Sequence, residues 1–261
     1  MTQTRAPAVA GQFYPGDAET LSHWLQQHMQ HPALEFTPPR MLILPHAGYI
    51  YSGDLAALGV CQLDANLHKR IIVLCPAHRM SFAGIALPSE ACQGFATPLG
   101  DIPLDPLLLS ALAGKPEVHR HDHPHQQEHA IEVLLPMLQH RLQHFTLLPI
   151  VVGNIAPKRL KMLLNPLLQQ RSTLLIVSSD LSHYLSYQEA KAQDTVTLSQ
   201  IMALEATLQP EQACGSTALN AALLLAARQG WRPRLLGQYN SGDMNGDKIR
   251  VVGYASLAFY A

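Results

Sequence analysis

Three segments of this chain share one plan, in which a short apolar run is followed at once by side chains that titrate or bind metals. The runs cover residues 41–44, 70–75 and 174–177. Uninterrupted apolar runs of this length are typical of strands that are buried on both faces, as strands are in parallel sheets. The pattern therefore predicts parallel strands at the centre of the molecule, with helices on both sides to cover them.

The rest of the chain alternates between further strand-like runs and helical patterns. Strands are expected within residues 83–89, 144–154, 232–240 and 249–260. Helices are expected within residues 128–143, 156–170, 186–204 and 215–230. Pro136 should kink or interrupt the first of these helices, and Gly230 should end the last. The Gly-rich stretch 241–247 is expected to be a turn that joins the two late strands.

Strands that alternate with helices indicate an α/β fold, and the late hairpin-like pair of strands makes the sheet mixed. We expect a three-layer α/β sandwich with a largely parallel, mixed central sheet. The 261 residues show no internal repeat and no linker, so residues 1–261 are expected to form a single domain.

The charge of the chain argues against nucleic acid or membrane partners. Lys and Arg total 18 against 19 for Asp and Glu, the net charge is −1, and the basic residues are scattered. No apolar run approaches the ~20 residues of a membrane-spanning helix, and the polar first residues do not resemble a signal peptide. We therefore expect a cytoplasmic protein that binds neither nucleic acid nor membranes.

Four side chains follow the ends of the three apolar runs. His46 follows the first run, His78 the second, and Asp180 and His183 the third. In open α/β sheets, ligands bind beyond the carboxyl ends of the strands, where the ends of parallel strands meet. The sequence therefore predicts that these four side chains share a site.

Cys214 is a fifth candidate, because it stands where a strong helical pattern begins. The dipole and free N–H groups of a helix start stabilise a thiolate, so we expect a lowered thiol pKa at this position. The other cysteines show no CxxC spacing and are expected to be free, buried and structural (Cys61, Cys75 and Cys92).

Histidines with a thiolate or a carboxylate are suitable ligands for iron, copper or zinc. His129, which follows Glu128 where a helix is expected to start, could support the ligands or transfer protons. Alternatively, His129 is an ordinary residue of the first helical turn, with Glu128 matched to the helix dipole. Both alternatives stay open at this point.

The tract "HRHDHPHQQEH" is rich in histidine, but mixed polar tracts of this kind lack a fixed geometry. Its first four histidines are expected to lie on an exposed loop away from the site (His119, His121, His123 and His125). A hydrolase mechanism has little support, since the chain contains neither a Gly-x-Ser-x-Gly elbow nor an HExxH zinc motif.

Seven motifs together resemble the Memo-like protein family. In chain order they are "AGQFYPGD", "LPHAGYIYSG", "PAHRMSFAGIALP", "QQEHAIEVLLPML", "VSSDLSHY", "ACGSTAL" and "NSGDMNGDKIRVVGYASLAF". They span nearly the whole chain. The resemblance implies a fold similar to that of the class III extradiol dioxygenases, which are non-haem iron enzymes. It also implies a pocket formed by five residues (His46, His78, Asp180, His183 and Cys214).

In the dioxygenases the third iron ligand is a carboxylate, whereas this chain offers Cys214 at the corresponding place. The leading hypothesis is an oxidoreductase whose iron or copper ion is bound by His46, His78 and Cys214. Asp180, His183 and His129 would then be the catalytic proton-transfer groups. The alternatives are a non-catalytic protein that uses the same pocket for metal handling or for a small molecule, peptide or protein partner, and, less favoured, a zinc hydrolase.

Overall fold

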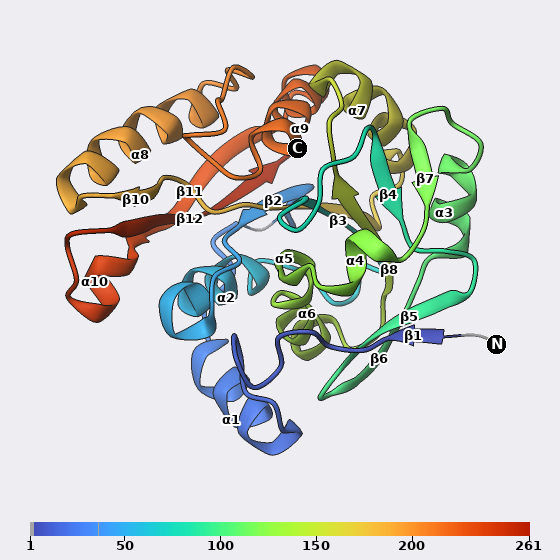
Figure 1. The fold of residues 1–261 in the computed structure, drawn as a ribbon, viewed down its shortest axis with the longest axis horizontal. Helices are drawn as coiled ribbons and strands as arrows, with labels where there is room; N and C mark the ends of the chain where they lie inside the picture. Colours follow the sequence, from blue (N-terminus) through green and yellow to red (C-terminus); the bar gives the residue numbers. More distant parts are fainter. Residues whose placement is uncertain (1–2, 36) are drawn as a thin grey trace.

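The structure, a computed structural model, describes residues 3–35 and 37–261, and in these residues a nine-stranded sheet forms the centre of the molecule (Figure 1). The strands follow the order β10 (His183–Leu185), β12 (Val251–Tyr260), β2 (Met41–Leu44), β9 (Thr173–Ser178), β3 (Arg70–Pro76), β8 (Thr146–Val152), β4 (Ile85–Leu87) and β7 (Val118–Arg120). The ninth strand, β11 (Arg232–Asn240), pairs with β12. The four middle strands from β2 to β8 are parallel, while β12 and β4 pair with them in the antiparallel sense. The predicted mixed sheet with a parallel centre is confirmed.

Helices cover both faces of this sheet, which gives the three layers that the sequence predicted (Figure 1). One face carries α1 (Ala18–His28), α2 (Asp54–Val60), α5 (His129–Glu132) and α6 (Leu135–Leu142). The other face carries α7 (Pro157–Leu164), α8 (Tyr187–Met202) and α9 (Ser216–Gln229). The remaining helical segments are α3 (Pro106–Leu112), α4 (His123–Gln126), α10 (Ser241–Asn245), a π-helical turn (Tyr49–Gly53) and a 3₁₀ turn (Asn165–Leu168).

The strands that precede the predicted site residues are neighbours in the sheet, in the order β2, β9, β3. Leu44 lies opposite Ser178, and Leu74 lies opposite Val177, so the three strands end at one edge. Every residue of β2 and β9 is buried. Because burial of a Leu, Ile or Val side chain contributes ~1.5–3 kcal/mol, the apolar runs hold these strand ends firmly in place.

Several local predictions were refined by the structure. The helix expected over 128–143 is interrupted between α5 and α6, and Pro136 lies in the first turn of α6, where its missing N–H costs nothing. Gly230 ends α9 in the left-handed conformation, at φ 69°. The stretch expected to be only a turn contains the short helix α10, whose start is capped by Asn240.

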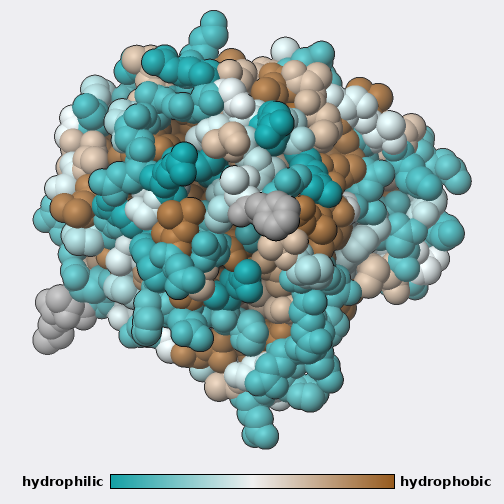
Figure 2. All heavy atoms as spheres, turned by 180° about the vertical axis from the view of Figure 1, so that it is seen from behind, coloured by the Kyte–Doolittle hydropathy of each residue, from teal (hydrophilic) through white to brown (hydrophobic). Residues whose placement is uncertain are grey.

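A small second sheet, which the sequence did not predict, lies beside the main one. It pairs β1 (Gln3–Arg5) with β5 (Cys92–Thr97) and β5 with β6 (Gly100–Pro103). The face of the molecule in Figure 2 is mainly hydrophilic, with hydrophobic residues in small separate groups. Across the described residues, every helix falls short of the length and apolar character that a bilayer crossing demands.

Candidate metal centre

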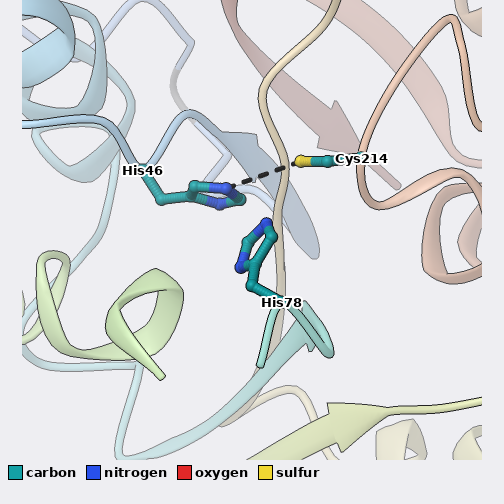
Figure 3. A group of neighbouring side chains, drawn as sticks. All are labelled: His46, His78 and Cys214. Carbon is teal, nitrogen blue, oxygen red and sulfur yellow. Dashed lines mark hydrogen bonds between the residues drawn. The ribbon is translucent and has the colours of Figure 1, made fainter. Parts of the chain in front are cut away.

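His46, His78 and Cys214 meet at the carboxyl edge of the sheet (Figure 3). His46 stands two residues after β2, His78 stands two residues after β3, and Cys214 comes from the loop before α9. Nε2 of His46 lies 3.5 Å from the sulfur of Cys214, and the possible ligand atoms of all three side chains lie within 4.8 Å of one another. The structure therefore brings together three residues that are far apart in the sequence.

Hydrogen bonds determine which nitrogen of His46 faces the cysteine. The hydroxyl of Ser178, at the end of β9, donates to the carbonyl oxygen of Ala130 at 2.6 Å. Since its single proton is used there, the hydroxyl oxygen accepts from Nδ1 of His46 at 2.8 Å. Burial lowers the pKa of His46 to about 3, so the ring is neutral near pH 7. Nε2 therefore keeps its lone pair and faces Cys214, as a metal ligand must.

Glu128 orients His78 in a similar way. Its carboxylate accepts the backbone N–H and the Nδ1–H of His78, each at 2.9 Å, and the backbone N–H of Ala130 at 3.0 Å. Burial disfavours the charge on Glu128, but the hydrogen bonds from His78 and Ala130 outweigh it and lower the carboxyl pKa to about 2. The ionised carboxylate only accepts hydrogen bonds, so it holds the imidazole proton on Nδ1 and leaves Nε2 of His78 free. Such a carboxylate commonly stands behind a metal-binding histidine.

The position of Cys214 relative to α9 and its thiol pKa both differ from the prediction. Helix α9 begins at Ser216, with Gly215 as its N-cap, so Cys214 lies outside the helix. Burial, and next the Asp180 carboxylate, raise the thiol pKa to about 12, although the backbone N–H of Asp180 donates to the sulfur at 3.3 Å. The predicted lowering of this pKa is wrong for the metal-free chain, because burial exceeds the effect of the helix start. A cation in the pocket would be needed to hold the sulfur as a thiolate at neutral pH.

Asp180 lies against His46 and is only 5% exposed. Its Oδ1 accepts the backbone N–H of His46 at 2.8 Å, and its Oδ2 lies 3.9 Å from Nε2 of the same residue. Burial raises the pKa of Asp180 above its usual range. His183, in β10, donates from Nδ1 to the carbonyl oxygen of Leu181 at 2.8 Å. Leu181 directly follows Asp180, so His183 lies close to the end of β9.

His129 is a third imidazole beside the candidate ligands. Its ring centroid lies 5.0 Å from that of His78, 5.4 Å from that of His46 and 4.8 Å from that of Phe13. Burial lowers its pKa to about 4. Its Nδ1 is buried without a hydrogen-bond partner among the described residues, 3.5 Å from the Glu128 carboxylate. His129 is therefore part of the pocket, while Glu128 does cap α5 as the alternative prediction required.

A groove of about 470 Å³ opens beside the ligand group. Residues 76–82 and 152–154 line it together with Cys214, so two of the three candidate ligands, His78 and Cys214, belong to its wall. Arg79 is the only Lys, Arg, Asp or Glu among the groove residues. Its side chain is exposed and makes no hydrogen bond or ion pair within the part of the chain that the structure describes. A ligand that reaches the candidate centre through this groove would meet one positive charge.

The histidine-rich tract is not the exposed loop that its composition predicted. His119 belongs to β7, and α4 contains His123 and His125. His119 and His123 are exposed and His121 is half-buried, but His125 is only 2% exposed and its Nε2 donates to the carbonyl oxygen of Ala86 at 3.2 Å. The prediction is wrong for His125, because α4 turns this ring inward onto β4.

Sequence reasoning missed two residues that build the site. No role was assigned to Ser178 from the sequence, and Glu128 was considered only together with its neighbour His129. Each lies within two positions of a predicted site residue, so adjacency was the only signal available. Their roles depend on contacts with residues 48 or more positions away, which local patterns do not reveal.

Comparison with known proteins gives one consistent result. The model of the Memo-like protein family matches residues 5–258. A MEMO1 family protein of Methanosarcina mazei is 33% identical over 272 residues, covering 98% of each chain, and one of Aquifex aeolicus is 31% identical over 276 residues, covering 98% of this chain and 99% of its own. A crystal structure of an uncharacterized Escherichia coli K12 protein matches 83% of this chain and 98% of its own with a TM-score of 0.53 and 14% identity, a likeness of fold alone.

Proposed function

Because this chain belongs to the Memo-like protein family, we propose that it binds one iron or copper ion through His46, His78 and Cys214. The proposal rests mainly on the 3.5 Å distance between Nε2 of His46 and the sulfur of Cys214. Ser178 and Glu128 support it, because they hold the imidazole protons on the two Nδ1 atoms and leave both Nε2 lone pairs for a metal.

The spacing of these atoms suits a metal ion. In a tetrahedral site, bonds of ~2.05 Å to nitrogen and ~2.3 Å to sulfur would put the two ligand atoms ~3.6 Å apart. The observed distance of 3.5 Å is close to that value. Thiolate is a soft ligand that favours copper, and imidazole suits both copper and iron. Zinc is the less favoured ion, because no zinc motif is present in the sequence.

A bound iron or copper ion would supply electron transfer and would polarise a substrate that binds to it. The chain itself offers groups that hold and move protons beside the candidate ligands. Asp180 has a raised pKa and can carry a proton next to His46. His129 is neutral near pH 7 and can accept a proton beside His78, and His183 is the third such group. On this proposal the protein is a metal-dependent oxidoreductase.

The proposed substrate is a small organic anion that lies in the groove beside His78 and Cys214. Arg79 supplies the one permanent charge of the groove, and a guanidinium binds a carboxylate or phosphate group in bidentate fashion. Met80 and Phe82 offer apolar contacts for the rest of such a molecule. This combination fits an anionic group on an apolar or aromatic body, with a further donor atom that reaches the metal.

A second candidate function is metal handling or partner binding without turnover, for example recognition of a peptide in the same pocket. The burial of Asp180 favours it. Both oxygens of this carboxylate face His46, and Asp180 does not line the groove, so its proton would have to travel past the imidazole to reach a substrate. In this case the metal would bind stoichiometrically, and no reaction would follow.

The two functions are separated by metal analysis after anaerobic purification, followed by oxygen consumption with catechol-type and thiol substrates. The oxidoreductase predicts one bound ion per chain and a metal-dependent uptake of oxygen that is lost in His46→Ala. One bound ion without turnover would favour the metal-handling role. If iron, copper and cobalt all fail to bind to the metal-free protein under anaerobic conditions, the proposed centre is wrong.

A further inference from the structure

We infer that Arg5 is a positioning residue, which sets the orientation of both candidate histidine ligands through residues 125–132. The inference rests on the proposed metal centre, because it concerns how that centre is held. Arg5 is the last residue of β1, in the small second sheet, and it touches none of the candidate ligands. Its effect would pass through the backbone and carboxylates of the segment that it binds.

The guanidinium of Arg5 makes most of its hydrogen bonds to this segment. Nε donates to the carbonyl oxygen of His125 at 2.6 Å, and Nη2 donates to that of Glu128 at 2.9 Å. Nη1 donates to the Glu132 carboxylate at 2.7 Å. The side chains of Arg5 and Glu132 are only 7% and 0% exposed, and the guanidinium lies over the Phe95 ring, 5.0 Å from its centroid. Charges that are this deeply buried need close, well-directed partners for both ions, and the Arg5–Glu132 pair has them.

Glu132 ties a second stretch of chain to the same point. Its carboxylate accepts the backbone N–H groups of Ala8 at 2.7 Å and Val9 at 2.9 Å, and the hydroxyl of Tyr14 at 2.8 Å. Together with Arg5, these contacts use all the lone-pair directions that a carboxylate offers. Residues 5–14 are therefore fastened to α5 as a strap.

Helix α5 carries the groups that hold both histidines. The Glu128 carboxylate at its start holds the proton of His78, and the Ala130 carbonyl within it receives the Ser178 hydroxyl that holds the proton of His46. A helix of four residues has almost no stability of its own, since nucleation costs more than one turn returns. The position of α5 must therefore come from its surroundings, which include the contacts of Arg5 with the Glu128 carbonyl and the Glu132 carboxylate.

Arg5→Lys would keep the positive charge that pairs with Glu132 but would lose the planar arrangement of N–H donors. A guanidinium presents five N–H donors in a rigid plane, whereas an ammonium group presents three donors at one point. Arg5→Lys should therefore leave the backbone carbonyls of His125 and Glu128 without their donor and allow α5 to move. The chain also offers a matched control, because Arg70 forms a bidentate ion pair with Asp105, at 2.7 and 2.9 Å, away from this segment.

The experiment compares Arg5→Lys with Arg70→Lys and wild type by two measurements. Imidazole ¹⁵N shifts of the metal-free proteins report whether His46 and His78 each keep one tautomer with the proton on Nδ1. Anaerobic competition gives the Co(II) affinity. We expect mixed tautomers and a loss of affinity of about tenfold for Arg5→Lys, and wild-type values for Arg70→Lys. Wild-type tautomers together with wild-type affinity in folded Arg5→Lys would overturn the inference.

The two measurements separate this inference from the proposed function. If wild type fails to bind Co(II), the proposed metal centre fails, but the ¹⁵N shifts of the metal-free proteins still decide whether Arg5 sets the tautomers. If Arg5→Lys does not fold, Glu132→Gln takes its place, with Asp105→Asn as its control. Glu132→Gln should then show the mixed tautomers, and a single Nδ1–H tautomer at both histidines in that variant would contradict the role of the strap.

Discussion

Cys214 supplies the only sulfur among the candidate ligands, and a thiolate is softer than imidazole or carboxylate. We predict that Cys214→Ser weakens Cu(I) binding by about 100-fold, since it removes a direct ligand. Cys214→Asp should shift the preference towards Fe(II), because a carboxylate oxygen is the harder ligand. Anaerobic metal competition on purified variants measures both effects.

The other three cysteines are the controls for this prediction. They are buried, as the sequence predicted, and none belongs to a group of possible ligands within the described residues (Cys61, Cys75 and Cys92). Their replacement by serine should change metal affinity little. Equal affinities for Cys214→Ser and these controls would remove the sulfur from the centre and leave the two histidines with Asp180 or His183.

Replacement of Arg79 would test whether the groove prefers anionic ligands. Arg79→Gln removes the only permanent charge that lines the groove but leaves His78 and Cys214 in place. We predict about tenfold weaker binding of benzoate or phenyl phosphate to the Co(II)-loaded protein, as expected for the loss of one charge-assisted hydrogen bond of ~1.5 kcal/mol. Titration of the Co(II) absorption spectrum measures this binding.

Arg79→Lys should retain part of the affinity, because it keeps the charge but not the planar guanidinium. Arg228, in the last turn of α9, carries a charge outside the groove, and Arg228→Gln should leave anion binding unchanged. If Arg79→Gln binds both anions as tightly as wild type, the groove does not select its ligand by this charge.

At the scale of elements, the start of α9 controls where Cys214 lies. A methyl group on Gly215 would lie 2.8 Å from both Cβ and Oγ of Ser179, so Gly215→Ala must push the start of α9 away from the end of β9. Because Cys214 is the preceding residue, its sulfur should move away from Nε2 of His46. We predict at least tenfold weaker Co(II) binding and a weaker sulfur-to-metal charge-transfer band, since changes in the residues that orient a metal ligand commonly cost that much.

Gly230, at the other end of the same helix, provides the control. It has φ 69° and no atom within 4 Å of an added methyl group, so Gly230→Ala brings backbone strain of ~1–2 kcal/mol without a clash. It should lower the melting temperature and leave Co(II) affinity unchanged. Comparable affinities for the two alanine variants would show that the start of α9 does not position the sulfur.

The elements that the sequence predicted well are those with a local apolar signal. β2, β3 and β9 are continuous buried runs, so their existence and their parallel arrangement followed from composition alone. β1 and β6 are short and mostly exposed, which leaves no periodic pattern to recognise. The break between α5 and α6 was foreseen at Pro136, but α10 was not, because its five residues resemble a turn.

At the scale of the whole molecule, the site was predictable where topology decides it. Parallel neighbours end at one edge, so His46, His78 and Asp180 had to lie near one another once their strands were adjacent. The strap from Arg5 to Tyr14 could not be predicted, because its contacts join residues 118 or more positions apart without any local pattern. The burial of His125 is another result of tertiary contacts, and the polar composition of the tract predicted an exposed side chain instead.

Buried neutral histidines also make the stability of the whole molecule depend on pH. Burial lowers the pKa of His125 to about 3, with the charge of Arg5 as a further cause, whereas an unfolded histidine titrates near pH 6.5. The unfolded chain therefore binds more protons than the folded chain between these values. It follows that the titration of His125 makes the free energy of unfolding decrease as pH falls from about 6.5 towards 3. His46 and His129 act in the same direction.

We predict that His125→Gln reduces the slope of unfolding free energy against pH, between pH 6 and 4.5, by about 1 kcal/mol per pH unit. Glutamine does not titrate, and its amide N–H can still donate to the carbonyl oxygen of Ala86, which His125 contacts in wild type. His119→Gln is the matched control, because His119 is exposed. Urea unfolding at several pH values measures the slopes, and equal slopes for wild type and His125→Gln would mean that His125 is protonated in the folded protein despite its burial.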